Sequence, residues 1–344
     1  MIEKIMPGIF RIELPMPDSS LETVNTYLLK GKERNLIIDS GINKKECREA
    51  LAKVLYELEV NLEETDFFTT HLHEDHFGLA PEMAPNGSTI YLNAPETIFW
   101  GSFSEWSENF EHGRKNGFPE EGVESLSRET PEFLTILPLE EMKNAANAYT
   151  GQKSPGGRIK IIGDGEVLNV GEYSLQCIMT PGHTSGHLCL YEPEKKLLFS
   201  GDHILETITP GIFLWPGENR NPLQEFLESL DKVSKLDVDL VLPGHRKTFR
   251  EHQGRISELK KHHYRREHEI ETILKFYGKN GKNAYGIASE VSWNIPQPWE
   301  QFTTQLQWMA LAETLAHLQY MKFQGKVTSK LLEDRVERYF LLTG

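Results

Sequence analysis

The sequence predicts an α/β fold, and two features of the chain predict it. Short apolar segments with the pattern of β-strands alternate with segments of helical periodicity, and the connections between them are short. Polar motifs rich in histidine and aspartate follow several of these strands, at the ends where open α/β sheets place ligands. We therefore expect an α/β domain whose functional site lies beyond its strand ends.

The first part of the chain predicts strands interrupted by one helix. A helix fits residues 44–59, because Ala50, Leu51, Val54, Leu55 and Leu58 fall on one side of it. One of the strands ends on the carboxylate of Asp39. The predicted strands are residues 9–14, 25–29, 35–39, 67–68 and 88–92.

Residues 95–150 have little strand pattern and many aromatic side chains, including Trp100, Phe110 and Phe118. We interpret them as a mostly helical insertion, followed by a loop at 151–157. The aromatic side chains either pack in a core or form the wall of an apolar substrate pocket.

Strands resume after this insertion and lead to the remaining polar motifs. A helix is expected at residues 222–236, before the last strand. The predicted strands are residues 159–162, 166–170, 173–179, 188–192, 196–200 and 238–242.

The pattern changes at about residue 254. Three helices are expected at residues 256–277, 285–291 and 299–320, and then a β-hairpin at 321–327. This order is typical of a winged-helix module. The sequence therefore predicts two domains, residues 1–253 and 254–344.

Composition and charge narrow the classes of function. The chain of 344 residues has a formal net charge of −14, and residues 251–344 contribute 13 basic and 11 acidic side chains. The acidic remainder repels polyanions, so nucleic acid is not the expected substrate. No apolar run approaches the ~20 residues of a membrane span, and the first residues lack a signal peptide's apolar core. We expect a cytoplasmic protein in which Cys47, Cys177 and Cys189 are core residues.

Residues 69–78, Thr-Thr-His-Leu-His-Glu-Asp-His-Phe-Gly, hold three imidazoles and two carboxylates within six positions. His71 and His73 share one side of an extended segment, because side chains alternate there. Asp75 and His76 follow where the chain turns. Histidine and aspartate suit Zn²⁺ and its first-row neighbours, so this stretch predicts a metal site. A solvated polar loop is the alternative.

Three further ligand-type residues, His183, Asp202 and His245, each follow a glycine in a strand-end context. With the ligands above, they could build a dinuclear centre that has a shared carboxylate and a bridging water or hydroxide. One metal ion would be held by His71, His73, His183 and Asp202, and the other by Asp75, His76, His245 and the same Asp202.

These motifs resemble those of the metallo-β-lactamase superfamily, in its glyoxalase II-like branch with a C-terminal winged helix. The motifs are His-x-His-x-Asp-His from His71, Thr-Pro-Gly-His-Thr-x-Gly-His from Thr180, Gly-Asp-His at 201–203 and Pro-Gly-His at 243–245. The resemblance implies an αββα four-layer sandwich with a two-metal site at one edge of its paired sheets. It also implies that Asp39 supports the ligand loops; a simple cap of the strand-end turn is the alternative.

Two differences from the motifs of related families narrow the choice of branch within the superfamily. Asp202 and His245 are too close in the sequence for the extra domain of the RNA-processing nucleases of this superfamily. His73 stands where the similar flavodiiron proteins have a glutamate, and no flavodoxin-like tail follows. An oxidoreductase is therefore disfavoured.

The predicted cofactors are two divalent metal ions, with Zn²⁺ expected and Fe or Mn as alternatives. They would lower the pKa of a bridging water and polarise the substrate's oxygen. Asp75 is the predicted catalytic residue that holds the hydroxide for attack. His203, beside Asp202, is the preferred acid or base ahead of His187, and a structural role is the alternative for both.

The predicted reaction is hydrolysis of a small acyl compound, a thioester ahead of an ester or lactone. The alternative is an endoribonuclease or phosphodiesterase that holds nucleic acid on the C-terminal module. In a third interpretation the protein binds metal without catalysis. The basic side chains for a nucleic acid would be Arg265, Arg266, Lys279, Lys282, Lys322 and Lys326. These charges could instead be solvated, with the module packed on the metal domain or on a second subunit of a homodimer.

Overall fold

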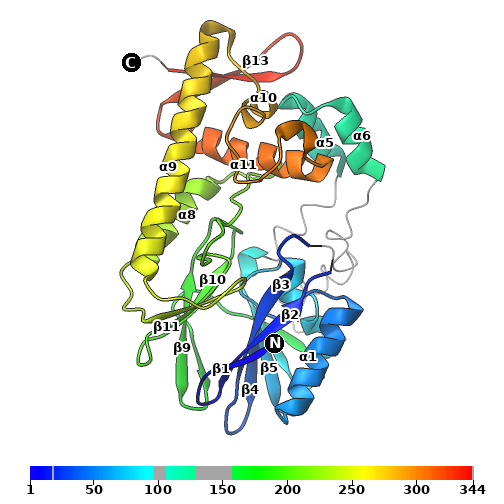
Figure 1. Ribbon diagram of the computed structural model, residues 1–344, viewed down its shortest axis with the longest axis vertical. Helices are drawn as coiled ribbons and strands as arrows, with labels where there is room; N and C mark the ends of the chain where they lie inside the picture. Colours follow the sequence, from blue (N-terminus) through cyan, green and yellow to red (C-terminus); the bar gives the residue numbers. More distant parts are fainter. Residues whose placement is uncertain (18, 97–105, 129–156, 343–344) are drawn as a thin grey trace. The chain divides into compact units, whose positions relative to one another are not determined.

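The computed structural model describes residues 1–17, 19–96, 106–128 and 157–342 (Figure 1). The chain forms two compact units. The first takes in the described parts of residues 1–101, 136–210 and 229–256, and the second those of 102–135, 211–228 and 257–344.

The first unit contains a mixed sheet with the strand order β1-β2-β3-β4-β5-β6-β7. The pairs from β1 to β4 are antiparallel, and those from β4 to β7 are parallel. The strands are β1 (Ile2–Met6), β2 (Ile9–Pro15), β3 (Thr23–Leu29), β4 (Asn35–Ile38), β5 (Thr65–Phe68), β6 (Thr89–Leu92) and β7 (Arg158–Ile161).

A second mixed sheet of the same unit has the order β12-β11-β10-β9-β8. Only the pair of β11 and β12 is parallel within this sheet. The strands are β8 (Val167–Val170), β9 (Tyr173–Met179), β10 (Leu188–Glu192), β11 (Leu197–Gly201) and β12 (Leu240–Pro243).

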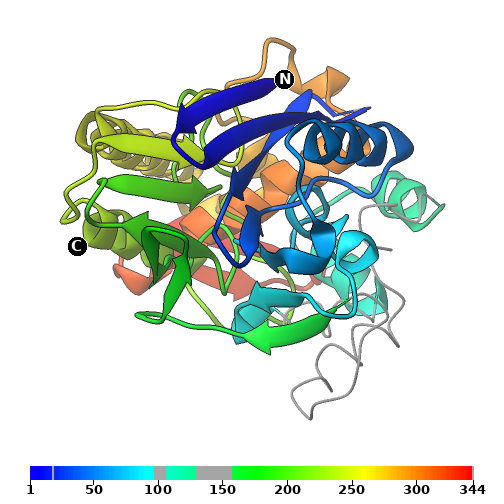
Figure 2. The same ribbon diagram turned by 90° about the horizontal axis from the view of Figure 1, so that it is seen from below.

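The two sheets pack against each other through one apolar core. Ile38 and Phe68 of the first sheet share this core with Leu190 of the second. The rings of Tyr27 and Phe199, one from each sheet, meet edge to face with centroids 5.3 Å apart. Figure 2 shows the N-terminal strands in blue and the strands of the second sheet in green. Burying each large apolar side chain contributes about 1.5–3 kcal/mol, so the core fixes the relation between the two sets of strand ends.

Helices flank the sheets of this unit. Helix α1 (Lys45–Glu57) contacts β2 and buries Leu51 and Leu55. Short helices α2 (Glu74–Phe77) and α3 (Ala80–Met83) follow β5. Helix α8 (Pro222–Val233) enters the unit at Ser229, where its hydroxyl donates to the carbonyl oxygen of Pro181 at 2.8 Å.

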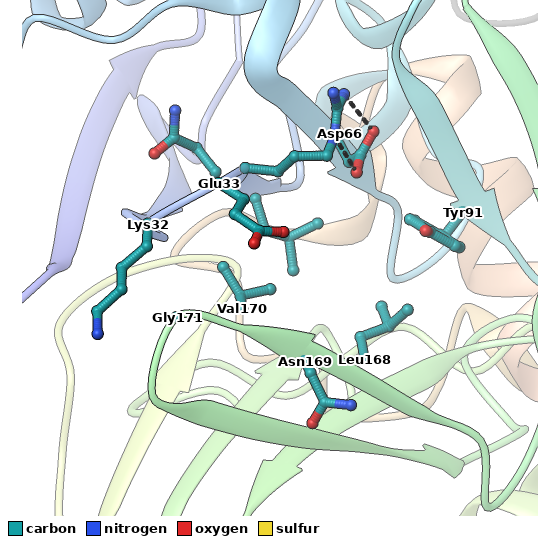
Figure 3. A pocket seen from close by; sticks show the side chains of 11 residues that line it. Lys32, Glu33, Asp66, Tyr91, Leu168, Asn169, Val170 and Gly171 are labelled. Carbon is teal, nitrogen blue, oxygen red and sulfur yellow. Dashed lines mark hydrogen bonds and ion pairs between the residues drawn. The ribbon is translucent and has the colours of Figure 1, made fainter.

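A cavity of about 400 Å³ lies at the amino ends of β4 and β5 (Figure 3). Arg34 and Asp66 form a two-point ion pair at its wall, with N···O distances of 2.8 Å. Leu168 and Val170 line its other side. The cavity therefore lies at the amino ends of these strands. From there the strands run toward the histidine motifs.

The second unit is helical and ends in a two-stranded hairpin. Its core joins Phe118, Ile270, Ile287, Leu315 and Tyr339. Its elements are α5 (Trp106–Lys115), α6 (Glu120–Arg128), α9 (His252–Tyr277, from Ser257 onward), η4 (Gly278–Asn280), α10 (Ala284–Ala288), η5 (Trp299–Gln301), α11 (Thr304–Phe323), β13 (Val327–Leu331) and β14 (Glu337–Leu341).

The predicted hairpin at 321–327 is wrong. Met321 continues α11 to Phe323 and is fully buried in the core of the second unit. Gly325, with φ of 71°, ends this helix region, and the hairpin consists of β13 and β14. The predicted insertion is helical where it is described, in α5 and α6, whereas residues 97–105 and 129–156 lie outside the described residues.

Within the described ranges, no helix combines the length and the apolar character that crossing a membrane requires. All three cysteines are buried and free, and burial raises the pKa of each thiol to about 12.

Candidate metal centre

The parallel strand pairs bring the ligand loops together. Ile38 of β4 lies opposite Phe68 of β5, so Asp39 and the residues after Phe68 leave the sheet side by side. In the other sheet, Gly201 of β11 pairs with Pro243 of β12, and the N–H of Gly244 donates to the carbonyl of Gly201 at 2.8 Å. Asp202 and His245 therefore leave from adjacent positions.

The first group of ligand atoms comes from three histidines. His71 Nε2 lies 2.9 Å from His73 Nδ1, and His183 Nε2 lies 3.1 Å from the same atom. These three nitrogens are mutually within reach of one ion. Nitrogens that share a tetrahedral Zn²⁺ at about 2.0–2.1 Å lie about 3.3 Å apart, so the spacing fits a metal ion.

The second group joins Asp75, His76 and His245. His245 Nε2 lies 3.2 Å from Asp75 Oδ2, and His76 Nε2 lies 3.6 Å from the same oxygen. Both imidazoles are buried, and Asp75 keeps 16% of its side chain exposed. Helix α2 carries Asp75 and His76, which places both beside the His245 loop.

Asp202 lies between the two groups. Its Oδ1 is 3.5 Å from His76 Nε2, and its Oδ2 is 3.5 Å from His245 Nε2 and 3.7 Å from His183 Nε2. One carboxylate thus faces histidines of both groups, which is the position expected of a shared ligand. All seven predicted ligands converge here.

Hydrogen bonds to the outer ring nitrogens orient two histidines of the second group. His76 Nδ1 lies 2.7 Å from Asp39 Oδ2, and His245 Nδ1 lies 2.9 Å from the carbonyl oxygen of Thr23. Both acceptors lack a proton, so each ring donates from Nδ1 and turns its Nε2 toward the site. Metal-binding histidines are typically held in this way.

Asp39 supports the first ligand loop, as expected. It accepts from the backbone N–H of Thr70 at 2.8 Å and from the Thr70 hydroxyl at 2.9 Å, in addition to His76. The Thr70 hydroxyl in turn lies 3.0 Å from His71 Nδ1. Since the hydroxyl donates to Asp39, it accepts from His71, which leaves Nε2 of His71 unprotonated.

The two groups differ in charge. Burial lowers the pKa of His71 well below its usual range and that of His73 to about 3. Burial also acts to lower the pKa of His245, but Asp202 raises it to about 10. Burial acts to raise the pKa of Asp202, and His245 and His76 hold it well below the usual range. His71 and His73 of the first group are therefore neutral, whereas the second group pairs carboxylates with protonated imidazoles.

Several buried polar atoms of the centre have no hydrogen-bond partner in the described part of the protein, as expected of metal ligands. Among the described residues, His76 Nε2, His245 Nε2 and Asp202 Oδ1 have no hydrogen-bond partner. Buried polar atoms without a partner are rare, and these three face the same space. A divalent cation would satisfy them and balance the two carboxylates.

The two other candidate histidines lie in the interior. His187 has its Nδ1 at 2.8 Å from the Thr180 hydroxyl, and its Nε2 accepts from the backbone N–H of Asp202 at 3.1 Å. It therefore orients the Asp202 loop. His203 is fully buried, with its ring centroid 6.2 Å from that of His187, and burial lowers its pKa to about 3. Its role as an acid or base stays a prediction.

Several supporting residues carry no metal-binding signature in the sequence. The side-chain amide of Asn25 donates to the carbonyls of Pro243 and Arg246, and so holds the His245 loop. Glu96 accepts from backbone N–H groups of two other ligand loops. In the sequence, only their positions near predicted strands set Asn25 and Glu96 apart from other polar residues.

Known proteins are similar to this chain in sequence and in fold. Residues 20–245 match the model of the Metallo-beta-lactamase superfamily. The chain is 25% identical to the probable metallo-hydrolase YqjP of Bacillus subtilis, over 93% of this chain and 94% of that protein. It is 24% identical to the acyl-coenzyme A thioesterase MBLAC2 of Homo sapiens, over 70% and 79% of the two chains.

A solved structure agrees with this assignment. A metallo-beta-lactamase family protein of Thermus thermophilus superposes with a TM-score of 0.76 at 27% identity, covering 98% of this chain and 100% of that one. The family match, the two mixed sheets and the groups of histidine and aspartate agree. The chain belongs to the metallo-beta-lactamase superfamily, and it is a metal-dependent hydrolase of that superfamily.

Proposed function

We propose that this protein is a dinuclear hydrolase that cleaves small acyl thioesters. The observation that carries the proposal is the position of Asp202, whose two oxygens face histidines of both ligand groups. We propose that two Zn²⁺ ions bind, one to each group with Asp202 between them, and that Fe or Mn are the alternatives.

When bound, divalent metal ions lower the pKa of water toward neutrality and polarise an acyl carbonyl. The protein's own residues supply orientation. Asp75 has 16% of its side chain exposed, against 10% for Asp202, so it is the carboxylate that water reaches more readily. In our proposal Asp75 Oδ2 holds the attacking hydroxide in line with the acyl carbon. Asp39 and Thr23 keep His76 and His245 in fixed ring orientations.

The thioester class rests on two supports. The human relative at 24% identity is named an acyl-coenzyme A thioesterase. The other support is the set of aromatic residues in segment 95–150. The structure describes the side chains of Phe110 and Phe118 from this set. Phe118 is in the core of the second unit against Trp308 and Tyr285, and Phe110 packs against the same core. The side chains of the other aromatic residues of that segment lie outside the described part of the chain, so the acyl pocket stays a prediction from the sequence.

The contacts of the basic residues disfavour nucleic acid as the substrate. Arg266 is buried against Trp293 and donates to the carbonyl of Ser292 at 3.0 Å. Lys282 is paired with Glu290, and Lys326 with Glu267 at 3.1 Å. Three of the six candidate side chains are thus engaged within the second unit, which leaves a weak electrostatic surface for a polyanion.

We propose that residues 254–344 form a winged-helix module that packs on protein rather than on nucleic acid. The order of α9, α10, α11 and the hairpin supports this. The division into residues 1–253 and 254–344, and a homodimer through this module, remain proposals.

A substrate panel tests the proposed reaction. The purified, metal-loaded protein would be assayed with acyl-CoA thioesters of increasing chain length, an aryl ester, a lactone and a phosphodiester. We expect thioester cleavage and a fall in kcat/KM of at least about 10²-fold in Asp75→Ala, since misplacement of the attacking group costs about that much. Asp66→Ala is the matched control, because Asp66 has 15% of its side chain exposed but pairs with Arg34. Cleavage of the phosphodiester alone would refute the proposal.

A further inference from the structure

The segment that follows β6, residues 93–96, makes hydrogen bonds to one of the ligand loops. The side-chain amide of Asn93 donates to the carbonyl oxygen of Gly186 at 3.0 Å. The hydroxyl of Ser185 donates to the carbonyl oxygen of Pro95 at 3.3 Å. These contacts seat the loop that carries His183 on residues 93–96.

Glu96 extends this contact to a second ligand loop. Its side chain is buried, with the residue 1% exposed. Oε1 accepts from the backbone N–H of Gly186 at 2.7 Å, and Oε2 accepts from the backbone N–H of Leu72 at 3.0 Å. One carboxylate therefore connects two segments that are far apart in the sequence.

Both connected segments carry ligands of the three-histidine group. Leu72 lies between His71 and His73, and Gly186 lies three residues after His183. The loops leave different sheets, β5 of the first and β9 of the second. The distance of 3.1 Å between His73 Nδ1 and His183 Nε2 thus depends on what joins these two loops.

The packing at Gly186 shows how close this join is. A Cβ atom at position 186 would lie 2.8 Å from the backbone nitrogen of Glu96, 3.0 Å from its Cγ and 3.1 Å from its Oε1. The first of these distances is too short for a real Cβ atom and the other two are tight, so even one methyl group would push Glu96 and the loop apart. The glycine permits the carboxylate to reach both N–H groups.

We propose that Glu96 is a positioning residue of the metal centre, which sets the spacing between the His71–His73 pair and His183. The inference rests on the proposed function, because it requires that these histidines bind a metal ion. A carboxylate suits this role, since it offers an acceptor oxygen to each N–H and has no proton of its own. Partners outside the ligand set that orient the ligands typically change metal affinity by about 10–100-fold when they are removed.

Glu96→Gln tests the proposal with little change of shape. The amide keeps one acceptor oxygen but turns an NH₂ group toward the other backbone N–H, which separates the two loops. We expect metal affinity, measured by chelator competition, to fall by about 10–100-fold. We also expect a shifted visible spectrum of the Co²⁺-loaded protein, because that spectrum reports ligand geometry.

Glu166→Gln is the matched control. The Glu166 carboxylate also accepts a backbone N–H, from Gly163 at 2.7 Å, on an exposed turn. This variant should keep the wild-type affinity and Co²⁺ spectrum. If Glu96→Gln does not fold, Glu96→Asp keeps the charge while withdrawing the oxygens, and it should show the same losses.

The outcomes separate the two proposals. If Glu96→Gln melts at a lower temperature but keeps the wild-type metal affinity and Co²⁺ spectrum, Glu96 is only a structural link and the inference is overturned. If the wild-type protein binds no metal, the metal centre itself is refuted, and the role of Glu96 falls with it.

Discussion

Each histidine whose outer nitrogen is fixed by the protein has only one nitrogen left for a metal ion. Asp39 fixes His76, Thr23 fixes His245, and Thr70 fixes His71. The tautomers follow from the acceptors, since a carboxylate and a backbone carbonyl have no proton to give. The centre is therefore organised for a cation before one binds.

Asp39→Asn tests this organisation at the level of one residue. Asp39 has φ of 55°, a conformation that asparagine tolerates, so the substitution adds little backbone strain. The amide cannot accept from both His76 and Thr70, and we expect metal affinity to fall by about 10–100-fold. Asp66→Asn, which weakens the contacts of Asp66 with Arg34 and with the backbone N–H of Thr89, should leave the metal affinity unchanged. Equal affinities for the two variants, measured by chelator competition, would contradict this role of Asp39.

The opposite pKa shifts of the two groups predict how metal binding depends on pH. His245 has a pKa of about 10 in the metal-free protein, because Asp202 outweighs the effect of burial, so it is protonated at pH 7. A metal ion must displace this proton, and affinity at the second group rises as the pH rises toward 10. His73, with a pKa lowered to about 3, is already neutral at pH 7.

Calorimetry in buffers of different ionisation enthalpy counts the released protons. One binding step should release protons at pH 7 and the other nearly none. Two steps that release equal numbers of protons would show that the groups do not differ in this way.

The sequence indicates the ligands but not the residues that orient them. Histidine and aspartate in dense motifs are recognisable by type, and the structure brings all seven together. Glu96 acts on backbone groups that lie 24 and 90 positions away, so no local pattern could reveal it. The same holds for Thr23, which offers only a carbonyl oxygen to His245.

At the level of elements, the turn after β12 depends on glycine. A Cβ atom at Gly244 would lie 2.4 Å from Asp202 Oδ1 and 2.7 Å from His76 Cε1. Both side chains are proposed ligands, so any larger residue here displaces the shared carboxylate.

Gly244→Ala should therefore cost about 1–3 kcal/mol of stability through overpacking and reduce the bound metal. Gly254→Ala is the control, because nothing lies within 4 Å of a Cβ there and alanine favours helix α9. Melting temperature and metal content of the two variants give the test. A Gly244→Ala protein with full metal content would contradict the close packing.

Elements with strong periodicity were predicted from the sequence, and weak ones were not. Helix α1 and strands β9 and β10 agree with the predicted segments to within about two residues. Strand β1 was missed because it has two exposed positions and no fully buried one. The hairpin was misplaced because Met321 belongs to the helical face that packs in the core, and β13 ends on exposed residues.

For the whole molecule, the metal centre joins loops from both sheets of the first unit. Asp75 and His76 follow the first sheet, while Asp202 and His245 follow the second. Metal ions held between these loops would oppose separation of the two sheets, as the apolar core between the sheets also does.

Removal of the metal should therefore lower the free energy of unfolding. A ligand present at a thousand times its dissociation constant adds about 4 kcal/mol. Urea unfolding with a chelator, and again after metal is restored, measures the difference. Superimposable curves from a protein shown to bind metal beforehand would contradict a centre that links the two sheets.

The number of metal ions per chain tests the central claim most directly. Elemental analysis of the purified protein, beside Asp202→Ala, compares the centre with and without its shared carboxylate. We predict about two metal ions per wild-type chain and clearly fewer in the variant. One metal ion or none in the wild type would contradict a dinuclear centre built on Asp202.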